Sequence, residues 1–196
     1  MCDDYVFSLL NAALPSLPED GCVQQLAKWI SAVKQWNRRV RVTAARDDRE
    51  LCDLMVADAA VLARHIQQDL SVVDVGSGAG APGLPLALMR PDLQVTLVEP
   101  MQKRAALLRL HTPDNANVVQ LRGEALDVRF DVAISRATLA PSAWLRLAAG
   151  LADEVWVMLA REEPPSEEGW SVAHDESYHW PLTNAQRRVV KYGLTG

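Results

Sequence analysis

Apolar residues in the first third of the chain recur every three or four positions, which is the spacing of a helix face. The three runs that show this spacing cover residues 6–14, 22–36 and 49–66. Pro15 and Pro18 separate the first two runs, and proline is disfavoured inside a helix. The pattern therefore predicts an all-helical module, and we place it over residues 1–69.

From residue 70 the pattern changes to short apolar, β-branched runs that alternate with helical stretches. The expected strands are 70–75, 93–99, 118–121, 130–134 and 154–159, and the expected helices are 83–89, 101–111 and 141–151. Continuously apolar strands that alternate with helices are typical of a parallel sheet covered on both faces. Two later runs, 170–178 and 187–192, are expected to add antiparallel strands. We therefore predict an α/β fold with one domain over residues 70–196.

A glycine-rich loop follows the first expected strand. The strand carries Asp74, and the glycines then fall as G-x-G-x-G-x-x-G over residues 76–83. Glycine allows positive φ angles and a close approach of backbone to ligand. A loop at this end of a parallel sheet lies where open α/β sheets bind ligands. The spacing differs from the dinucleotide pattern G-x-G-x-x-G, which disfavours a nicotinamide enzyme, and is similar to the loop of adenosylmethionine-dependent methyltransferases.

An acidic residue, Glu99, ends the second expected strand. A carboxylate at that point can accept hydrogen bonds from both ribose hydroxyls of an adenosine. Alone, the loop could be a tight turn and Glu99 an exposed strand end, but together at this spacing they predict that the chain binds S-adenosyl-L-methionine.

Composition narrows the class of protein further. The chain has 196 residues, is 49% hydrophobic and carries a formal net charge of −5, which excludes a disordered chain. The three cysteines lie far apart without CxxC spacing, so we expect no disulfide framework, no metal and a cytoplasmic location. No apolar run reaches membrane-spanning length and no basic leader is evident, so we expect no membrane partner.

Beyond the loop, the resemblance to one family becomes specific. Residues 74–86, followed by Arg90-Pro91, resemble the small-subunit ribosomal RNA guanine-N7 methyltransferase family (RsmG, also GidB). Further matching segments, in the family's order, are Lys103-Arg104, Arg122-Gly123-Glu124, Ile134-Ser135-Arg136-Ala137 and Arg187-Arg188-Val189-Val190-Lys191. The resemblance implies a Rossmann-like methyltransferase fold, with a mostly parallel sheet, an antiparallel last strand and an N-terminal helical module. It also implies methylation of guanine N7 in small-subunit (16S) ribosomal RNA or the 30S ribosomal subunit by a monomer.

The loop, the strand-end acid and the resemblance together predict a set of cofactor-binding residues. They are Asp74, Gly76, Ser77, Gly78, Gly80, Ala81, Glu99, Gly123, Glu124 and Arg136. The resemblance places Gly123 and Glu124 at the adenine and Arg136 at the substrate edge of the cofactor. We expect Arg136 to position groups rather than to exchange a proton, because guanine N7 has a lone pair and no proton. Glu124 and Arg136 could instead be ordinary surface residues.

Three segments depart from the family's pattern. The stretch Arg-His-x-x-Asp-Ser is replaced by residues 54–59, which keep only Asp58. The stretch Tyr-Asn-Leu-Thr becomes residues 40–43, and Lys-Gly becomes Ala160-Arg161. These positions lie outside the cofactor loops but bear on the substrate. The alternatives are therefore a non-catalytic RNA-binding or ribosome-binding member, or a methyltransferase that acts on another RNA.

Clustered basic residues are the expected RNA contacts. They are Arg38, Arg39, Arg41, Arg46, Lys103, Arg104 and Arg161. Phosphate contacts supply most non-specific affinity for nucleic acid, so a local patch can serve an acidic protein. The competing interpretation is an ordinary solvated charged face.

Overall fold

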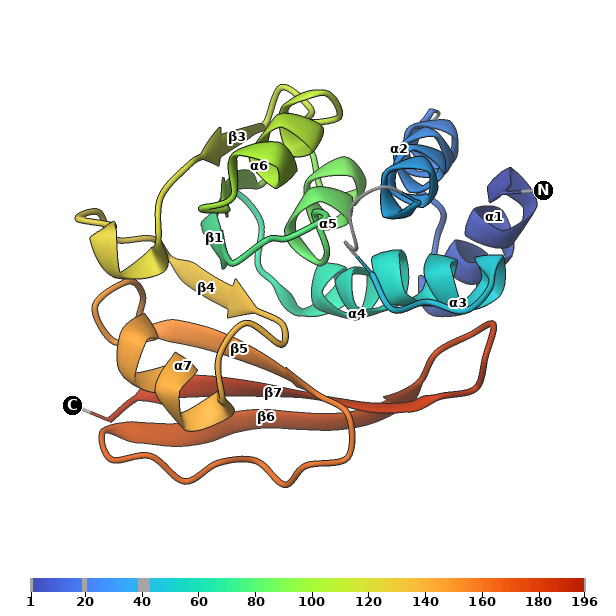
Figure 1. Ribbon diagram of the computed structural model, residues 1–196. Coiled ribbons are helices and arrows are strands. Elements are labelled where there is room, and N and C mark those ends of the chain that lie inside the picture. The colour runs from blue at the N-terminus through green and yellow to red at the C-terminus, as the bar shows by residue number, and fades with distance from the viewer. Residues whose placement is uncertain (1, 19–20, 39–42, 196) are drawn as a thin grey trace.

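The chain forms one seven-stranded sheet, seen in a computed structural model that describes residues 2–18, 21–38 and 43–195 (Figure 1). Its strands are β1 (Ser71–Val75), β2 (Gln94–Val98), β3 (Ala116–Val119), β4 (Val132–Ser135), β5 (Glu154–Leu159), β6 (Trp170–His179) and β7 (Gln186–Leu194). They lie in the order β3-β2-β1-β4-β5-β7-β6. The first five strands are parallel, whereas β7 runs antiparallel to β5 and β6 antiparallel to β7. The predicted α/β fold, with its antiparallel closing strands, is confirmed.

Helices cover both faces of this sheet. They are α1 (Cys2–Ala13), α2 (Cys22–Asn37), α3 (Asp48–Cys52), α4 (Asp58–His65), α5 (Gly83–Met89), α6 (Gln102–Arg109) and α7 (Pro141–Ala148). Successive strand residues point to opposite faces. Val72 accordingly joins a hydrophobic cluster with α1, α2, α4 and α5, whereas Val73 joins a second cluster with α7.

The N-terminal helices pack directly on the sheet. They share one hydrophobic cluster with β1, β2 and α5. The buried indole of Trp29 in α2 also donates a hydrogen bond of 3.0 Å to the carbonyl of Ala79 in the glycine loop. The expected boundary at residue 69 therefore marks the change from helices alone to alternating strands and helices. The hydrophobic core continues across this boundary.

The third predicted helix is not a regular α-helix. Between α3 and α4 the chain forms a π-helical turn, Asp53–Ala57. The buried carboxylate of Asp53 accepts hydrogen bonds from the backbone amides of Leu182 and Thr183, at 3.1 and 2.8 Å. Such turns are rare and occur mostly inside α-helices, often at functional sites. Hydrophobic spacing alone could not show it, because its partners lie about 130 residues away along the chain.

Strand β3 begins and ends two residues earlier than its apolar run suggested. The side-chain amide of Asn115 donates to the carbonyls of Ala87, Arg90 and Leu93, at 3.1, 3.1 and 2.9 Å. These bonds fix the chain where Ala116 enters its register with β2. None of the helices in the described ranges is long and apolar enough to cross a membrane.

Candidate functional site

The glycine loop is closed against the neighbouring strand. The backbone amides of Gly76 and Ser77 both donate to the carbonyl of Val98, at 2.8 and 3.0 Å. Gly76 has a φ of +76°, and a Cβ there would lie 2.3 Å from the side chain of Thr138. Only glycine fits this position, because both the backbone angle and the close contact exclude a side chain.

Asp74 lies beneath this loop. Its Oδ2 accepts a hydrogen bond of 3.0 Å from the backbone amide of Gly83, whereas its buried Oδ1 has no partner among the described residues. Complete burial, partly offset by the bond from Gly83, raises the pKa of Asp74 to about 7. Asp74 therefore fixes the loop where α5 begins, and its side chain does not line the cavity above.

A cavity of about 530 Å³ opens over the carboxyl-terminal ends of β1 and β2, a size typical of small-molecule sites. Of the predicted cofactor residues, those in its wall are Gly76, Ser77, Gly78, Ala81, Glu99 and Arg136. Arg104 also lines it, and the buried Nε of Arg104 has no partner within the described part of the chain. The structure thus brings together the loop, the strand-end acid and two guanidinium groups.

Glu99 joins the glycine loop to the chain after β2. Its Oε2 accepts from the amide of Gly78 at 2.9 Å, and its Oε1 accepts from the amide of Met101 at 2.8 Å. A carboxylate offers about four lone-pair sites. Two of them are therefore left for ribose hydroxyls, although Glu99 itself is nearly buried.

The other predicted cofactor residues lie around the cavity rather than in its wall. Gly80 packs beneath the loop against Trp29 and Leu84, and Gly123 packs against Val75. Glu124 is exposed, in a short 3-10 helix Gly123–Ala125 that follows β3. Contacts of these residues and of Asp74 with the cofactor stay predictions.

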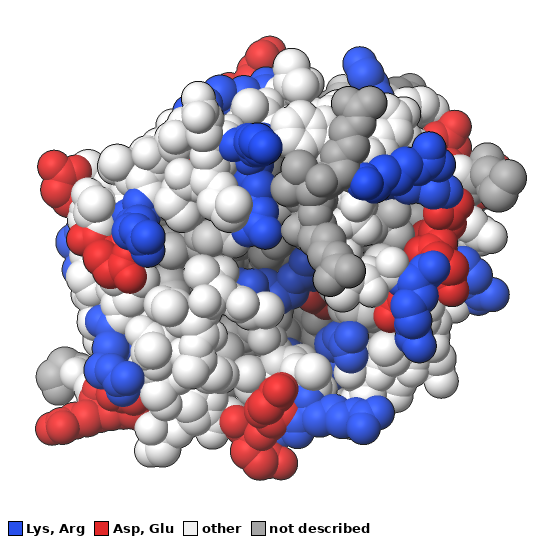
Figure 2. All heavy atoms as spheres, in the orientation of Figure 1, with Lys and Arg blue, Asp and Glu red and all other residues white. Residues whose placement is uncertain are grey.

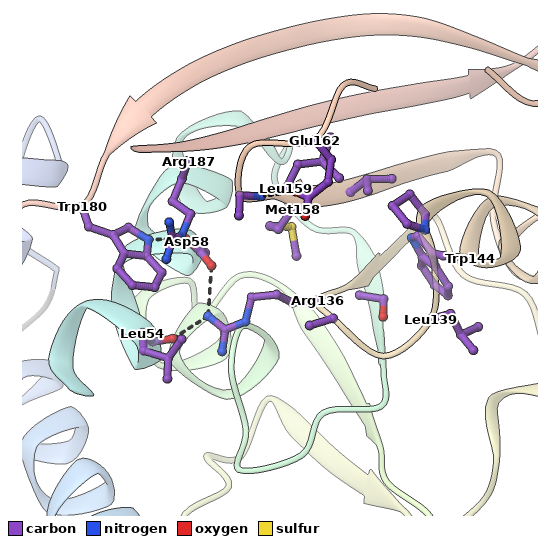
Figure 3. Close-up of a pocket in the computed structure, with 15 residues that line it drawn as sticks. Leu54, Asp58, Arg136, Leu139, Trp144, Met158, Leu159, Glu162, Trp180 and Arg187 are labelled. Carbon is purple, nitrogen blue, oxygen red and sulfur yellow. Dashed lines mark hydrogen bonds and ion pairs between the residues drawn. The ribbon is translucent and has the colours of Figure 1, made fainter. Parts of the chain in front are cut away.

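A second cavity of about 350 Å³ adjoins the first (Figure 3). It is lined by Leu54, Asp58, Ser135, Arg136, Ala137, Leu139, Pro141, Trp144, Val157, Met158, Leu159, Ala160, Glu162, Trp180 and Arg187. The two cavities share Leu54, Arg136 and Ala137. Arg136 therefore stands at the boundary between the two cavities.

Asp58 holds Arg136 in this position. Arg136 Nη1 donates to Asp58 Oδ2 at 3.0 Å and to the carbonyl of Leu54 in the π-helical turn (Figure 3). The other oxygen, Oδ1, accepts from the hydroxyl of Tyr178 at 2.6 Å and from the indole of Trp180 at 2.7 Å. The one residue kept from the family's Arg-His-x-x-Asp-Ser stretch is therefore the centre of a buried network.

The C-terminal hairpin also contributes to the second cavity. The guanidinium of Arg187 lies 3.7 Å from the ring centroid of Trp180, a cation–π geometry. Sequence reasoning did not select Tyr178, Trp180 or Arg187 as site residues. The only signal was the match of residues 187–191 to the family, because no local spacing connects β7 with the π-helical turn.

Two of the three family departures reach the cavity walls, whereas the changed residues 40–42 lie outside the described residues. Leu54 lines both cavities and Met55 lines the first. These are the positions where the family has Arg-His. Apolar side chains therefore line the cavities at these positions. The sequence had suggested only that these positions lie outside the cofactor loops.

The predicted RNA-binding residues within the described ranges lie mostly at the surface, and Arg104 lines the first cavity. Arg38, Lys103 and Arg161 are exposed, and Arg46 is exposed and forms an ion pair of 3.0 Å with Glu50. Arg39 and Arg41 lie outside the described residues. Figure 2 shows Lys and Arg side chains gathered around a hollow in the middle of this face. Their contacts with RNA stay predictions.

The fold is that of Rossmann-like methyltransferases. Magnesium protoporphyrin IX methyltransferase from Synechocystis, solved with bound SAH, is 15% identical, with a TM-score of 0.58 over 84% of this chain and 94% of that one. A Burkholderia thailandensis N1-methyltransferase of 1,6-didemethyltoxoflavin, solved with S-adenosylhomocysteine, is 16% identical, with a TM-score of 0.55 over 92% and 93%. The fold is thus one that these methyltransferases, solved with S-adenosylhomocysteine, share with this chain.

Comparison of sequences identifies the family within this class. The family described as rRNA small subunit methyltransferase G (GidB) matches residues 22–168. Ribosomal RNA small subunit methyltransferase G of Methylobacillus flagellatus is 34% identical over 178 residues, covering 85% of this chain and 86% of that protein. The Anaeromyxobacter protein of the same name is 27% identical over 94% of this chain and 93% of its own length. The chain belongs to the ribosomal RNA small subunit methyltransferase G family, which confirms the resemblance seen in the sequence.

Proposed function

We propose that this protein transfers a methyl group from S-adenosyl-L-methionine to N7 of a guanine in small-subunit ribosomal RNA. The observation that carries the proposal is the pair of cavities that meet at Arg136 in a chain of this family. One cavity takes the cofactor and the other takes the target base.

The residues of the first cavity fit the proposed cofactor. The loop glycines leave space along the backbone, and a Cβ at Gly78 would meet nothing nearer than the Gly76 carbonyl at 3.8 Å. Glu99 supplies acceptors for ribose hydroxyls, and Arg104 or Arg136 supplies donors for a carboxylate. When bound, S-adenosyl-L-methionine supplies an electrophilic methyl group on a sulfonium.

The second cavity fits a flat, partly polar base. Its walls include Leu139, Trp144 and Met158, and guanidinium groups of Arg136 and Arg187 face it. Apolar walls exclude water, and guanidinium groups donate to carbonyl or phosphate oxygens. The chain's contribution to the reaction is to hold the base in line with the methyl group.

The acid and base groups of the site suit an acceptor that needs no proton removed. Among the described residues that line the two cavities there is no cysteine and no histidine. The carboxylates are engaged: Asp58 accepts from Arg136, and Glu162 accepts from the amides of Ala160 and Arg161 at 2.9 and 3.0 Å. Guanine N7 attacks with an in-plane lone pair, so no general base is required.

The proposed setting follows from the substrate. We infer that the protein acts as a monomer in the cytoplasm on small ribosomal subunits, and that its exposed basic residues contact RNA phosphates. A binding-only member is not favoured, because the relatives are named as methyltransferases and the cofactor cavity is intact.

The test is transfer of radiolabel from S-adenosyl-L-methionine to small ribosomal subunits from a strain that lacks the modification. We expect label in small-subunit ribosomal RNA, none in large subunits, and strongly reduced transfer by an Arg136→Ala variant that still folds. Tight cofactor binding without transfer to any ribosomal RNA would contradict the proposal.

A further inference from the structure

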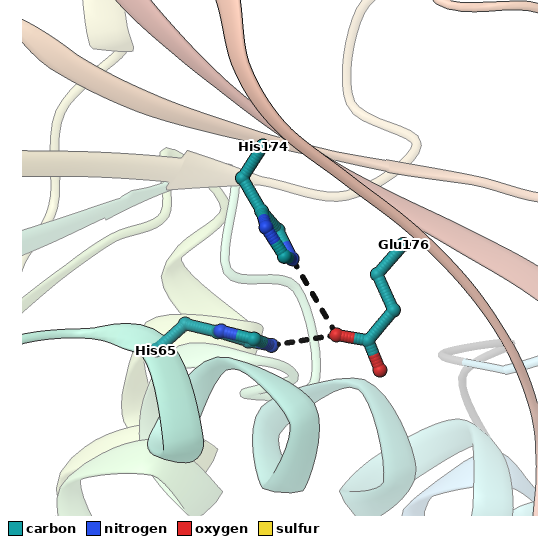
Figure 4. Close-up of side chains that lie close together, drawn as sticks. All are labelled: His65, His174 and Glu176. Carbon is teal, nitrogen blue, oxygen red and sulfur yellow. Dashed lines mark hydrogen bonds and ion pairs between the residues drawn. The ribbon is translucent and has the colours of Figure 1, made fainter.

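Three side chains of types that can ligate a metal meet between α4 and the C-terminal hairpin, outside both cavities. His65 ends α4, and His174 and Glu176 lie on β6 (Figure 4). Glu176 Oε2 lies 2.7 Å from Nε2 of His65 and 3.5 Å from Nε2 of His174. One ligand atom from each of the three residues lies within 4.8 Å of the other two.

Regular geometry explains why these residues meet. Alternate strand residues share a face, so Glu176 points to the same side of β6 as Tyr178. On α4, His65 follows Asp58 by seven residues, or about two helical turns, and so lies on the same face. Since Tyr178 bonds Asp58, the same strand and helix faces bring Glu176 to His65.

We propose that His65, His174 and Glu176 bind one divalent transition-metal ion, for which zinc is the best match. Two imidazoles and one carboxylate are a ligand set typical of zinc and its neighbours rather than of magnesium or calcium. A tetrahedral site with bonds of about 2.1 Å places ligand atoms about 3.4 Å apart. The observed separations reach that value with small side-chain movements, and water completes the coordination.

The surroundings of the cluster support a metal site. The buried Nε2 of His174 has no hydrogen-bond partner among the described residues, although it faces Glu176. Glu176 Oε1 pairs with Arg64 at 2.7 Å, which orients the carboxylate and leaves Oε2 toward the histidines. The ring of Trp156 lies 5.6 Å from that of His65 and 6.0 Å from that of His174, so both imidazoles are held by packing. Outer partners of this kind are usual for metal ligands.

A metal here ties the helix that positions Arg136 to the hairpin that lines the second cavity. Asp58 and His65 are both on α4, and Tyr178 and Glu176 are both on β6. The ion therefore acts as a structural cross-link between these two elements, and it takes no part in methyl transfer.

The test is calorimetric titration of the tag-free, metal-depleted full chain with zinc chloride. We expect one ion per chain, a rise in Tm with zinc and none with magnesium. His174→Ala and the isosteric Glu176→Gln each lower zinc affinity at least about ten-fold, as expected for loss of one ligand. Matched controls are His179→Ala, which removes an exposed histidine from the same strand, and Cys2→Ser, which removes a half-buried thiol; both keep the wild-type affinity.

Cobalt substitution gives a second measurement that needs no variant. The bound ion is expected to show visible bands of a four- or five-coordinate site without a thiolate charge-transfer band. Absence of binding, affinity unchanged in both ligand variants, loss of binding in Cys2→Ser, or a thiolate band would each overturn the proposal.

Discussion

Gly78 is the residue at which we expect an added side chain to block the cofactor most directly. Its amide bonds Glu99, and its φ is +59°. A Cβ there meets no close protein atom, so it projects into the space that the cofactor would use. The strain of a non-glycine residue at positive φ costs about 1–3 kcal/mol, which a stable domain tolerates.

Replacing Gly78 by valine is therefore expected to abolish cofactor binding and to leave the chain folded. Calorimetry with S-adenosyl-L-methionine, alongside circular dichroism, measures both effects. The control is Gly193→Ala, because Gly193 has no close neighbours for a Cβ and no positive φ. Normal affinity in Gly78→Val would place the cofactor elsewhere.

Asp74 predicts an unusual dependence of stability on pH. Burial raises its pKa from 3.8 to about 7, so between these values the folded chain holds a proton that the unfolded chain has released. The contribution of Asp74 to the free energy of unfolding is fully present below pH 3.8. It is lost as pH rises toward 7, by up to about 1.4 kcal/mol per pH unit.

The Asp74→Asn variant removes this titration. We measure the free energy of unfolding by denaturant from pH 4 to pH 8. The free energy of unfolding of the variant is expected to rise relative to that of the wild type up to about pH 7, and the difference then stays constant. If the free energies of unfolding of Asp74→Asn and the wild type depended on pH in the same way, the raised pKa of Asp74 would be contradicted.

Among the elements, the helix with the π-helical turn links the two cavities. It presents the Leu54 carbonyl and the Asp58 carboxylate to the same guanidinium. Asp58 is 3% exposed, and breaking a buried ion pair by removing one partner costs about 3–5 kcal/mol. The milder Asp58→Asn keeps an acceptor for Tyr178 and Trp180 but removes the charge that holds Arg136.

We expect Asp58→Asn to lower kcat at least about ten-fold, the effect of losing one hydrogen bond to a charged group, with little change in cofactor affinity. The control is Asp53→Asn, which alters the same turn where it bonds the Leu182–Thr183 loop. That control is expected to lose stability and to keep kcat. Equal kcat in Asp58→Asn and wild type would show that Arg136 needs no such support.

The same elements show what the sequence can and cannot predict. The β-branched runs, the glycine spacing and Glu99 place the cofactor cavity, because strand ends in a parallel sheet converge on one edge. Neither the Asp58 network nor the pairing of His65 with Glu176 could be predicted. Arg136 lies 78 residues from Asp58 along the chain, and the other partners in these contacts lie more than 100 residues apart. Hydrophobic periodicity reports which face of an element is buried, and it does not report which distant polar group meets that face.

At the scale of the whole molecule, an acidic chain must bind a polyanion through a local surface. The formal net charge is −5, so we expect steering toward RNA to depend on exposed basic residues. Arg38 follows α2 and is exposed, and Arg39 is its neighbour in the sequence.

Reversing both Arg38 and Arg39 to glutamate is expected to weaken RNA binding. The slope of log affinity against log salt concentration is expected to fall by about 1 for each phosphate that the variant no longer neutralises. Cofactor affinity should not change. The control is Arg129→Glu, which lies before β4, at the edge of the sheet opposite the cavities. An unchanged salt slope would make the two arginines part of an ordinary solvated face.

The proposed function is tested most directly by identification of the methylated nucleoside. Small-subunit ribosomal RNA is treated with this protein and S-adenosyl-L-methionine, digested to nucleosides and analysed by mass spectrometry. We expect 7-methylguanosine, because the described residues of the site offer neither the free general base nor the thiolate that other positions require. Methylation on an exocyclic amine or on carbon 5 of a pyrimidine, or no methylated nucleoside at all, would contradict the proposed function.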